Sequence, residues 1–534
     1  MIKRKDVFAY TILAIILFPV IFGFLGTDSA IYLQAGATIL KGEKIYVDFI
    51  DIKTPFFFTS YTIINLLINN NPHYLHLLIF IVLFFTAILL YHYITKEFNY
   101  KIALSASIIY SLTTLIVGHT LYYHTEIIYG FLLLLIIIYY SREYETDGVI
   151  SIKKNSFNRL KLGLLIGLYI SLKYTFAIVL IPFLFVDFFY VRTDLKKSLK
   201  QNLYLYAMML IVIIISHFWL FDPQIFEGYK ETLRLLSNYA NTPPISSKLS
   251  RDIVKVTGQF FGDHLSLLFT FSAFVGFIDV FRYQWTSKQK SIIITSFLLV
   301  GALLLSVYIE RKLIIYHFGR LLIPFSIISG IGIVLLIEKL KEFWINTTNK
   351  TMYRTLIFLF VFFMLIIGPI ARYIGILRFP YNALKGKERY YEFIDQQRPN
   401  FFNYSEKLKL VDFVNRNYDS SFQTLIVSIG SFDLIYELNT KVIKKIPQRN
   451  AFLPKPSNTS FYDEFIKFLQ KSDLLIFQKN DGMFENLTGN TKSSFQLAKE
   501  DKLANKIIEE NFEIKYETNV YVVYQKKIRE SIIK

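Results

Sequence analysis

Long apolar runs dominate this sequence. Of its 534 residues, 53% are hydrophobic and only 19% are charged, whereas soluble domains are usually about a quarter charged. Many of the runs reach the roughly 17 to 25 residues that a helix needs to cross a bilayer core. We predict a polytopic α-helical membrane protein with about eleven spans, over residues 7–25, 74–95, 101–118, 124–141, 160–174, 175–191, 203–221, 265–281, 291–308, 319–337 and 353–372.

The basic residues orient these spans. The net charge is +18, and most of the cations lie in alternate loops, as they do on the cytoplasmic side of membrane proteins. We therefore expect a multi-pass protein of the cell (inner) membrane with a cytoplasmic N-terminus. The first run is too long for the h-region of a signal peptide, so it predicts an uncleaved helix. There are no cysteines, which excludes disulfides and thiolate metal sites.

Beyond the last span the pattern changes. We divide the chain into a transmembrane body (1–372), a linker on the outer membrane face (373–404) and a soluble extracytoplasmic α/β domain (405–534). Alternating strand and helix patterns support the last assignment. The expected elements are helices at 406–417, 461–470 and 497–510, and strands at 424–428, 473–477 and 520–524.

The outer-face stretch 26–59 is dense in charge. Residues 28–42 predict a helix lying on the membrane with one apolar face, and 56–68 predict a second, short one. Asp28 can be the N-cap of the first helix, because Asp caps helices well. A carboxylate at the mouth of a membrane cavity can instead act as a general base.

Further charged residues border the spans. Glu126 begins the fourth span, where it can be a functional residue or only interact with the helix dipole. His119 and His124 lie beside it in the sequence, so a divalent metal site is conceivable but not supported. Five cations and a histidine share the outer face with it: Lys53, Lys173, Arg311, Lys312, Arg320 and His317. They can bind a lipid phosphate or only extend to the interface. Acids and cations together suit displacement of a phosphate leaving group.

Several blocks resemble GT-C membrane glycosyltransferases, in the branch of the protein O-mannosyltransferases and the lipid A aminoarabinose transferase. They are Asp28-Ser-Ala-x-Tyr32, Ala37-x-x-Leu40-x-Gly42, Tyr46-x-Asp48, Asp51-x-Lys53-x-Pro55, Thr125-Glu126, Gly163-Leu-Leu-Ile-Gly167 through Lys173, and His317-Phe-Gly-Arg320 with Pro324. The resemblance covers roughly residues 1–372. Where the family usually has Lys-Pro-Pro, this chain has Lys53-Thr54-Pro55.

The resemblance implies a function on the outer face. The protein would transfer a hexose or pentose from a polyprenyl-phosphate donor, with inversion, to a hydroxyl of a cell-envelope glycan (such as lipopolysaccharide), lipid or protein, without a required cofactor. Asp28 would be the catalytic base and Glu126 a second acid. The donor phosphate would be bound by Lys53, Arg320, His317 and Lys173. Loop-shaping or acceptor residues would be Asp48, Asp51, Tyr122, Tyr123 and His124.

Two other functions stay open from the sequence. One is a transporter or a lipid-linked-oligosaccharide flippase, which would have the same topology. The other is a catalytically inactive GT-C-like scaffold, in which Asp28 is only a cap. The sequence contains no Walker loop, GxGxxG, HExxH or GxSxG motif, so no nucleotide-driven, zinc-protease or serine-hydrolase function is indicated.

Overall fold

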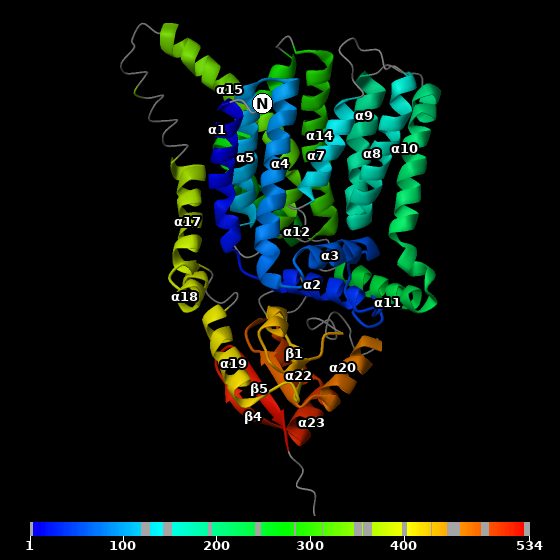
Figure 1. Ribbon diagram of the computed structural model, residues 1–534, viewed down its shortest axis with the longest axis vertical. Helices are drawn as coiled ribbons and strands as arrows, with labels where there is room; N and C mark the ends of the chain where they lie inside the picture. Colours follow the sequence, from blue (N-terminus) through cyan, green and yellow to red (C-terminus); the bar gives the residue numbers. More distant parts are fainter. Residues whose placement is uncertain are drawn as a thin grey trace, which may run out of the picture. The chain divides into compact units, whose positions relative to one another are not determined.

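The structure is a computed structural model (Figure 1). It describes residues 4–118, 129–142, 152–190, 195–240, 247–281, 285–311, 313–346, 355, 366–397, 403–428, 430–445, 460–481 and 491–527. The chain divides into two compact units. The helical unit comprises Met1–Phe24, Tyr74–Phe218 and Ser246–Arg378, and the mixed unit comprises Leu25–His73, Trp219–Ile245 and Phe379–Lys534. These units group distant segments and do not follow the predicted sequential order.

The helical unit contains α-helices joined by short 3-10 and π segments. Its α-helices are α1 (Arg4–Leu17), α4 (Leu75–Glu97), α5 (Tyr100–Gly118), α7 (Gly130–Ser141), α8 (Ile152–Leu172), α9 (Leu180–Tyr190), α10 (Leu195–Ser216), α12 (Ser247–Gln259), α13 (Leu267–Ile278), α14 (Ser287–Glu310) and α15 (Leu322–Asn346). Its short segments are η1 (Phe18–Phe22), η3 (Tyr174–Val179), η5 (Phe260–His264), η6 (Asp279–Phe281), η7 (Ile315–Leu321) and η8 (Ile366–Ile370). The division between the units falls within α17 (Ala371–Ala383).

The predicted polytopic helical architecture is confirmed. Among the described residues, five helices are long and apolar enough to cross a membrane: Arg4–Phe22, Pro72–Glu97, Tyr100–Gly118, Ser287–Glu310 and Ile315–Glu342. A sixth span is present if Leu249–His264 and Leu267–Phe281, which meet at 95°, are counted as one bent pair. The total of about eleven stays a prediction, since parts of several expected spans lie outside the described residues.

The long apolar run at 160–191 is broken where a charged residue interrupts it. Helix α8 ends at Leu172, and Lys173 has extended backbone angles (φ −159°, ψ 117°) before η3 begins. Glycines let α8 approach α10 closely: a Cβ atom on Gly163 would lie 2.4 Å from the carbonyl oxygen of Leu205. Small residues at such interfaces are typical of helix packing in membranes.

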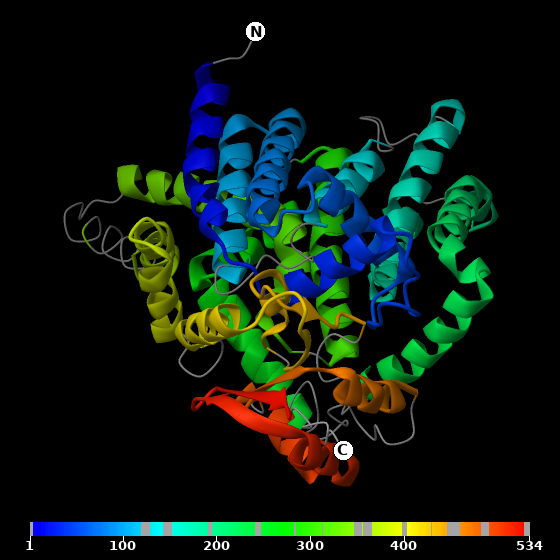
Figure 2. The ribbon, with the colours of Figure 1, turned by 60° about the horizontal axis from the view of Figure 1, so that its bottom comes forward.

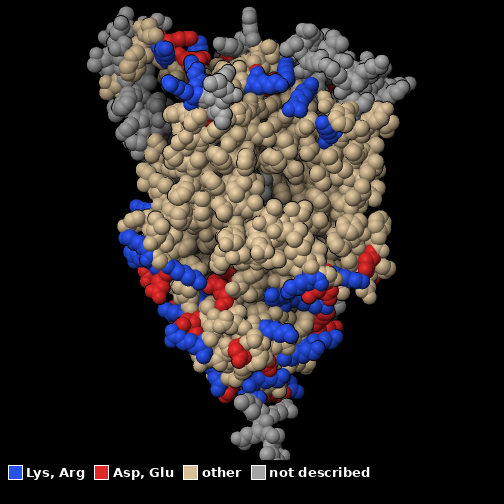
Figure 3. Space-filling view, viewed as in Figure 1, with Lys and Arg blue, Asp and Glu red and all other residues tan. Residues whose placement is uncertain are grey.

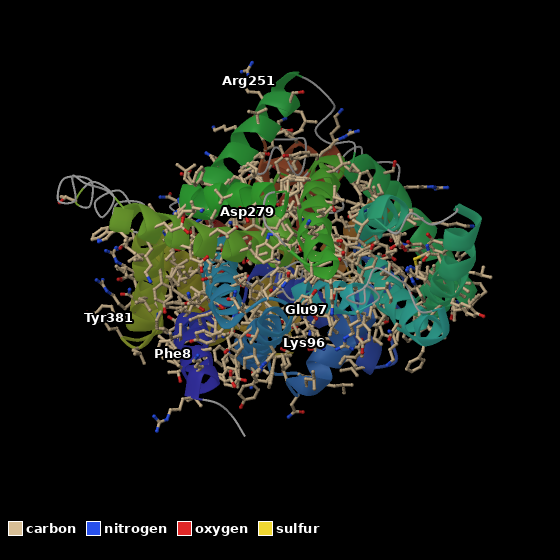
Figure 4. The ribbon with its side chains drawn as sticks, turned by 90° about the horizontal axis from the view of Figure 1, so that it is seen from above. Phe8, Lys96, Glu97, Arg251, Asp279 and Tyr381 are labelled. Carbon is tan, nitrogen blue, oxygen red and sulfur yellow. The ribbon has the colours of Figure 1, made fainter. Side chains whose placement is uncertain are left out.

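The surface of the helical unit matches a lipid environment. Figure 3 shows a broad surface of the bundle without charged side chains, and Lys and Arg gathered at the end where α1 begins. Figure 4 looks onto that end and labels Lys96 and Glu97 at the end of α4. Glu97 pairs with Lys288 of α14 at 2.8 Å. Phe8 is 56% exposed, as expected for a side chain that faces lipid.

The mixed unit combines helices from the first outer loop with the C-terminal domain. Its α-helices are α2 (Thr27–Leu40), α3 (Pro55–Leu67), α11 (Pro223–Ala240), α18 (Lys387–Gln397), α19 (Tyr404–Asn417), α20 (Ser460–Lys471), α22 (Ser494–Glu500) and α23 (Lys502–Asn511), and η9 (Phe432–Tyr436) is a 3-10 turn. The expected short helices at 28–42 and 56–68 correspond to α2 and α3. The expected linker at 373–404 is largely helical, in α17 and α18.

The C-terminal domain is built on a five-stranded mixed sheet (Figure 2). Its strands are β1 (Gln423–Val427), β2 (Lys441–Val442), β3 (Leu474–Gln478), β4 (Phe512–Glu517) and β5 (Tyr521–Lys526), in the order β2-β1-β3-β5-β4. β1 is parallel to β2 and β3, and β5 is antiparallel to β3 and β4. The sequence predicted β1, β3 and β5 but missed β2 and β4.

Apolar side chains from both layers form the core of this domain. Leu475, Phe477 and Val522 from the strands pack with Leu469 of α20 and Ile508 of α23. Helix α23 is separated from α22 by Asp501, whose carboxylate caps α23 by accepting from the backbone of Leu503 and Ala504. The single helix expected at 497–510 is therefore two helices. The predicted α/β domain is otherwise confirmed.

Candidate active site

Asp28 lies in the first turn of α2. The N-cap of this helix is Gly26, which has extended backbone angles and no side-chain cap bond. The interpretation of Asp28 as the N-cap is therefore wrong: its backbone is already helical, one residue after Thr27. Asp28 is half-buried and lies in the first turn of α2, at the positive end of the helix dipole.

Helix α2 is enclosed on almost every side. Every residue from Ser29 to Gly36 is buried, so α2 packs on more than the one apolar face expected, and its position on the membrane stays a prediction. Asn65 of α3 donates a hydrogen bond to the Leu33 carbonyl at 2.6 Å. A Cβ atom on Gly36 would lie 2.5 Å from the carbonyl oxygen of Tyr61. The small side chains of α2 allow this close packing, which holds Asp28 on a rigid element.

Lys53 is positioned by the loop that follows α2. The Tyr46 hydroxyl donates to the Lys53 carbonyl at 2.5 Å. Thr54 is the N-cap of α3, because its hydroxyl accepts from the backbone of Phe57 at 3.2 Å, and Pro55 is the first helical residue. The departure from Lys-Pro-Pro thus has a local reason: threonine supplies a cap that proline cannot supply.

Lys53 lies against the part of α2 that carries Tyr32. The Lys53 ammonium lies 5.4 Å from the centre of the Tyr32 ring. Tyr32 follows Asp28 by four residues, so the two side chains are neighbours on the helix surface. Lys53, which is 25 residues from Asp28 in the sequence, therefore lies one helical turn from Asp28 along α2.

The other acids of the loop shape its backbone. The exposed Asp48 accepts from the Lys44 backbone at 2.7 Å, and Asp51 accepts from the Ile52 backbone at 2.6 Å. Burial raises the pKa of the Asp51 carboxyl, and the nearby charge of Lys53 opposes this rise.

The loop is anchored at several points within the mixed unit. Lys44 pairs with Asp222, which precedes α11, at 2.6 Å, and the Ile50 backbone donates to the Lys445 carbonyl at 2.9 Å. Tyr46 has a left-handed backbone (φ 62°), a strained conformation for an aromatic residue that tertiary packing must hold in place. A Cβ atom on Gly228 would lie 2.3 Å from the Tyr46 carbonyl oxygen, so α11 presses closely on this strained residue.

Two of the predicted cations, Lys173 and Arg320, belong to the helical unit, where they converge on a residue that the prediction omitted. Glu310, the last residue of α14, pairs with Lys173 at 2.9 Å and with Arg320 at 2.8 Å. His317 Nδ1 lies 3.8 Å from the same carboxylate, and the Thr175 hydroxyl donates to it at 2.5 Å. We call these five residues the Glu310 cluster. An acid at the end of a long apolar run was the signal that could have identified Glu310.

The two main cations of the Glu310 cluster differ in exposure. The Arg320 side chain is 0% exposed and also donates to the Ser306 hydroxyl at 2.7 Å. The Lys173 side chain is 26% exposed. The Phe176 ring lies beneath both, 5.0 Å from the Arg320 guanidinium and 6.0 Å from the Lys173 ammonium. Arg320 is therefore committed to the interior, whereas Lys173 retains access for an anionic ligand.

Part of the predicted site lies outside the described residues. Tyr122, Tyr123, His124 and Glu126 fall in 119–128, as does His119, so their predicted roles stay predictions. The conceivable metal site near Glu126 lies there too. Among the described residues, no group of three or more His, Asp or Glu side chains could hold a metal ion.

Known proteins resemble this chain in sequence and in fold. Residues 53–221 match the family described as dolichyl-phosphate-mannose-protein mannosyltransferase. No curated protein matches the sequence. Two crystal structures of ArnT from Cupriavidus metallidurans are similar in fold at 11% identity: the form bound to undecaprenyl phosphate (TM-score 0.58, 98% of each chain) and the apo form (TM-score 0.57, 97% of each chain).

An archaeal enzyme has a related fold. The Archaeoglobus fulgidus oligosaccharyltransferase, tethered with an acceptor peptide, matches with a TM-score of 0.52 and 13% identity, over 98% of this chain and 74% of that one. The protein is thus a multi-pass membrane protein with the fold of these transferases. The family match covers residues 53–221, and the likeness to these structures shows a shared fold.

Proposed function

We propose that the protein transfers a hexose or pentose from a polyprenyl-phosphate donor to a hydroxyl group of a cell-envelope glycan, lipid or protein. The reaction takes place on the outer face of the inner membrane. The observation that carries this proposal is the contact of Lys53 with the Tyr32 ring at 5.4 Å, one helical turn from Asp28 on α2. The lipid phosphate bound to the similar ArnT structure supports the donor class.

The chemistry assigns one role to each charge. Asp28 removes the proton of the acceptor hydroxyl, whose oxygen forms a bond to the anomeric carbon of the donor sugar. The bond from that carbon to the phosphate oxygen breaks, and the electron pair leaves with the polyprenyl phosphate. Attack from the side opposite the leaving group inverts the anomeric carbon. Lys53 stabilises the departing phosphate by its charge.

The Glu310 cluster contributes a second cation for the donor. Lys173 and Arg320 together carry one more positive charge than Glu310 neutralises. Because Arg320 is buried, we assign the phosphate contact to Lys173 and the positioning of Glu310 to Arg320. His317 lies 3.8 Å from Glu310 and belongs to the same positioning group. The reaction needs no cofactor beyond the lipid-linked donor, and Glu126 keeps its proposed role as a second acid.

A deletion strain tests the function and the base together. Mass spectrometry of its envelope glycans should reveal the loss of one sugar. Complementation with wild-type protein should restore the mass, and complementation with Asp28→Asn should not, because the amide keeps the shape of the side chain but cannot accept the proton. Glu43→Gln, an exposed acid of the same loop, is the matched control and should restore it.

The outcomes separate the alternatives. Restoration of the glycan by Asp28→Asn would refute the base assignment. Unchanged glycans in the deletion strain, with lipid-linked sugar crossing proteoliposome membranes in the presence of the protein, would support a flippase. In purified form, Asp28→Asn should transfer sugar about 100- to 10,000-fold more slowly than the wild type, the usual contribution of general base catalysis.

A further inference from the structure

The C-terminal domain contains a pocket far along the chain from the residues assigned above. Its volume is about 710 Å³, which lies within the range of about 300 to 1,000 Å³ found for small-molecule sites. Most of the lining is polar and comes from three segments: Asn403, Glu406 and Lys409 around the start of α19, Asn480 after β3, and Thr518 and Asn519 between β4 and β5.

The pocket lies at the carboxyl edge of the parallel strands. Asn480 follows the end of β3 by two residues, and Gln478 of β3 pairs with Tyr521 at the start of β5. Strand β1 has parallel neighbours on both sides, β2 and β3. A sheet in which successive connections leave in opposite directions opens a crevice at the carboxyl ends of its strands, where ligands bind in open α/β folds.

Asn403 supplies a hydrogen-bond donor without a partner. Its side-chain nitrogen is buried and makes no hydrogen bond in the structure. The residue is the N-cap of α19, has a left-handed backbone (φ 47°) and makes no side-chain cap bond. Buried polar atoms are almost always paired, because an unmade bond costs the desolvation of the group. Asn403 lines the pocket, so a rotation of its side chain would present this donor to a ligand oxygen.

The charges of the pocket do not favour an anion. Its one lining cation, Lys409, pairs with Glu406 at 2.7 Å. The first backbone N–H groups of α19, at Tyr404 and Ser405, donate to the Asp395 carboxylate at 2.7 and 2.8 Å. A phosphate would compete with Asp395 for the helix N-terminus and would meet Glu406 as a like charge. A neutral ligand meets neither obstacle.

An aromatic ring lies near the charged pair. Tyr516 stacks on Phe413, with ring centres 4.6 Å apart. Burial raises the pKa of its hydroxyl, and the charge of Glu406 adds to the rise, so the ring is close to that carboxylate. The amide, carboxylate and hydroxyl groups that line the pocket can hydrogen-bond to a hydroxyl-bearing ligand.

We propose that this pocket binds a neutral saccharide, with the Asn403 amide donating to a sugar oxygen. The C-terminal domain is then a glycan-binding module in its own right. This inference does not rest on the proposed sugar transfer, because the pocket contains none of the residues assigned to that reaction.

The test uses the full chain in lipid nanodiscs, since glycoside detergents would occupy a saccharide site. Saturation-transfer NMR with the methyl glycosides of glucose, galactose, mannose and N-acetylglucosamine should detect binding of at least one. Asn403→Gly removes the amide, and glycine adopts the left-handed backbone without strain. It should weaken binding about tenfold, the factor that corresponds to one hydrogen bond of about 1.4 kcal/mol.

Asn70→Gly is the matched control, because Asn70 is exposed and also has a left-handed backbone (φ 55°). The Asn70→Gly protein should bind the glycoside with the same affinity as the wild type. Asn519→Trp, at an exposed turn position, should abolish binding by filling the pocket. The proposal is overturned if none of the four glycosides binds at millimolar concentration. It is equally overturned if inorganic phosphate displaces the sugar, or if both pocket variants bind as tightly as the control.

Discussion

Arg320 holds Glu310 by two parallel contacts, from Nη1 to Oε1 at 2.8 Å and from Nη2 to Oε2 at 3.2 Å. The guanidinium is fully buried, and the carboxylate is 11% exposed. Two-point pairs of this kind fix orientation as well as distance. Lys173, at the break between α8 and η3, is bound to the same carboxylate. One acid therefore ties together the end of α14, η7 and the break in the run at 160–191.

Removing that acid should destabilise the helical unit. Glu310→Gln leaves the buried Arg320 without its anion, and breaking a buried pair in this way typically costs about 3 to 5 kcal/mol. Thermal unfolding in nanodiscs should show a clear drop in melting temperature. Glu342→Gln breaks an exposed pair with Lys339 and should change stability by less than about 1 kcal/mol. Equal effects of the two variants would contradict the structural role of Glu310.

Lys173 should affect the donor more than the fold. Lys173→Met keeps the contact between Glu310 and Arg320 but removes the partly exposed ammonium. Under the proposed function, KM for the lipid-linked donor should rise about tenfold, the equivalent of about 1.4 kcal/mol, with a smaller change in kcat. Lys173→Arg should recover part of the loss. An unchanged KM in a folded Lys173→Met protein would remove Lys173 from the donor site.

Asp51 should make the stability of the protein depend on pH. Its pKa is raised above the ordinary value of 3.8, so the folded state holds the proton more tightly than the unfolded chain. The stability that this protonation supplies is present at low pH and is lost as pH rises through the folded-state pKa. Asp51→Asn cannot ionise, and its side-chain oxygen can still accept from the Ile52 backbone. The variant should melt at a higher temperature than the wild type at neutral pH.

The same comparison near pH 3.8 should show little difference between Asp51→Asn and the wild type. Asp48→Asn, which removes an exposed acid from the same loop, is the control and should not raise the melting temperature. If Asp51→Asn melts lower at neutral pH, the attraction between Asp51 and Lys53 outweighs the cost of burial.

Gly36 should tolerate no side chain. Gly36→Ala places a methyl group 2.5 Å from the Tyr61 carbonyl oxygen, and overpacking of this kind usually costs about 1 to 3 kcal/mol. Because α2 must shift, sugar transfer should fall together with melting temperature. Gly301→Ala on α14 meets nothing within 4 Å and should be neutral or stabilising by up to about 1 kcal/mol. A fully active and stable Gly36→Ala protein would show that α2 and α3 can separate without loss.

Local sequence patterns determined the features of this protein that could be predicted. Apolar runs interrupted by charge require helices in a membrane, whatever their neighbours, because lipid cannot satisfy free backbone groups. The helices α2 and α3 were predicted from a different pattern, that of short helices lying at the membrane face. In the C-terminal domain, continuous apolar runs identified β1, β3 and β5. The strand β4 (FEIKYE) was missed because only its first residue is buried, which leaves no strong apolar pattern.

The sequence identified candidate residues of the site but not their contacts. The residue types and spacing pointed to Asp28, Lys53, Lys173 and Arg320, but not to the use of each. Gly26 instead of Asp28 is the N-cap of α2, because the backbone at Asp28 is already helical. Glu310 was omitted because an acid next to Arg311 is typical of a solvated turn. Only the folded structure places Glu310 against Lys173, which lies 137 residues earlier in the sequence. Local sequence determines which residues can ionise and which segments are helical; only tertiary packing decides which charges meet and which of them remain open to a ligand.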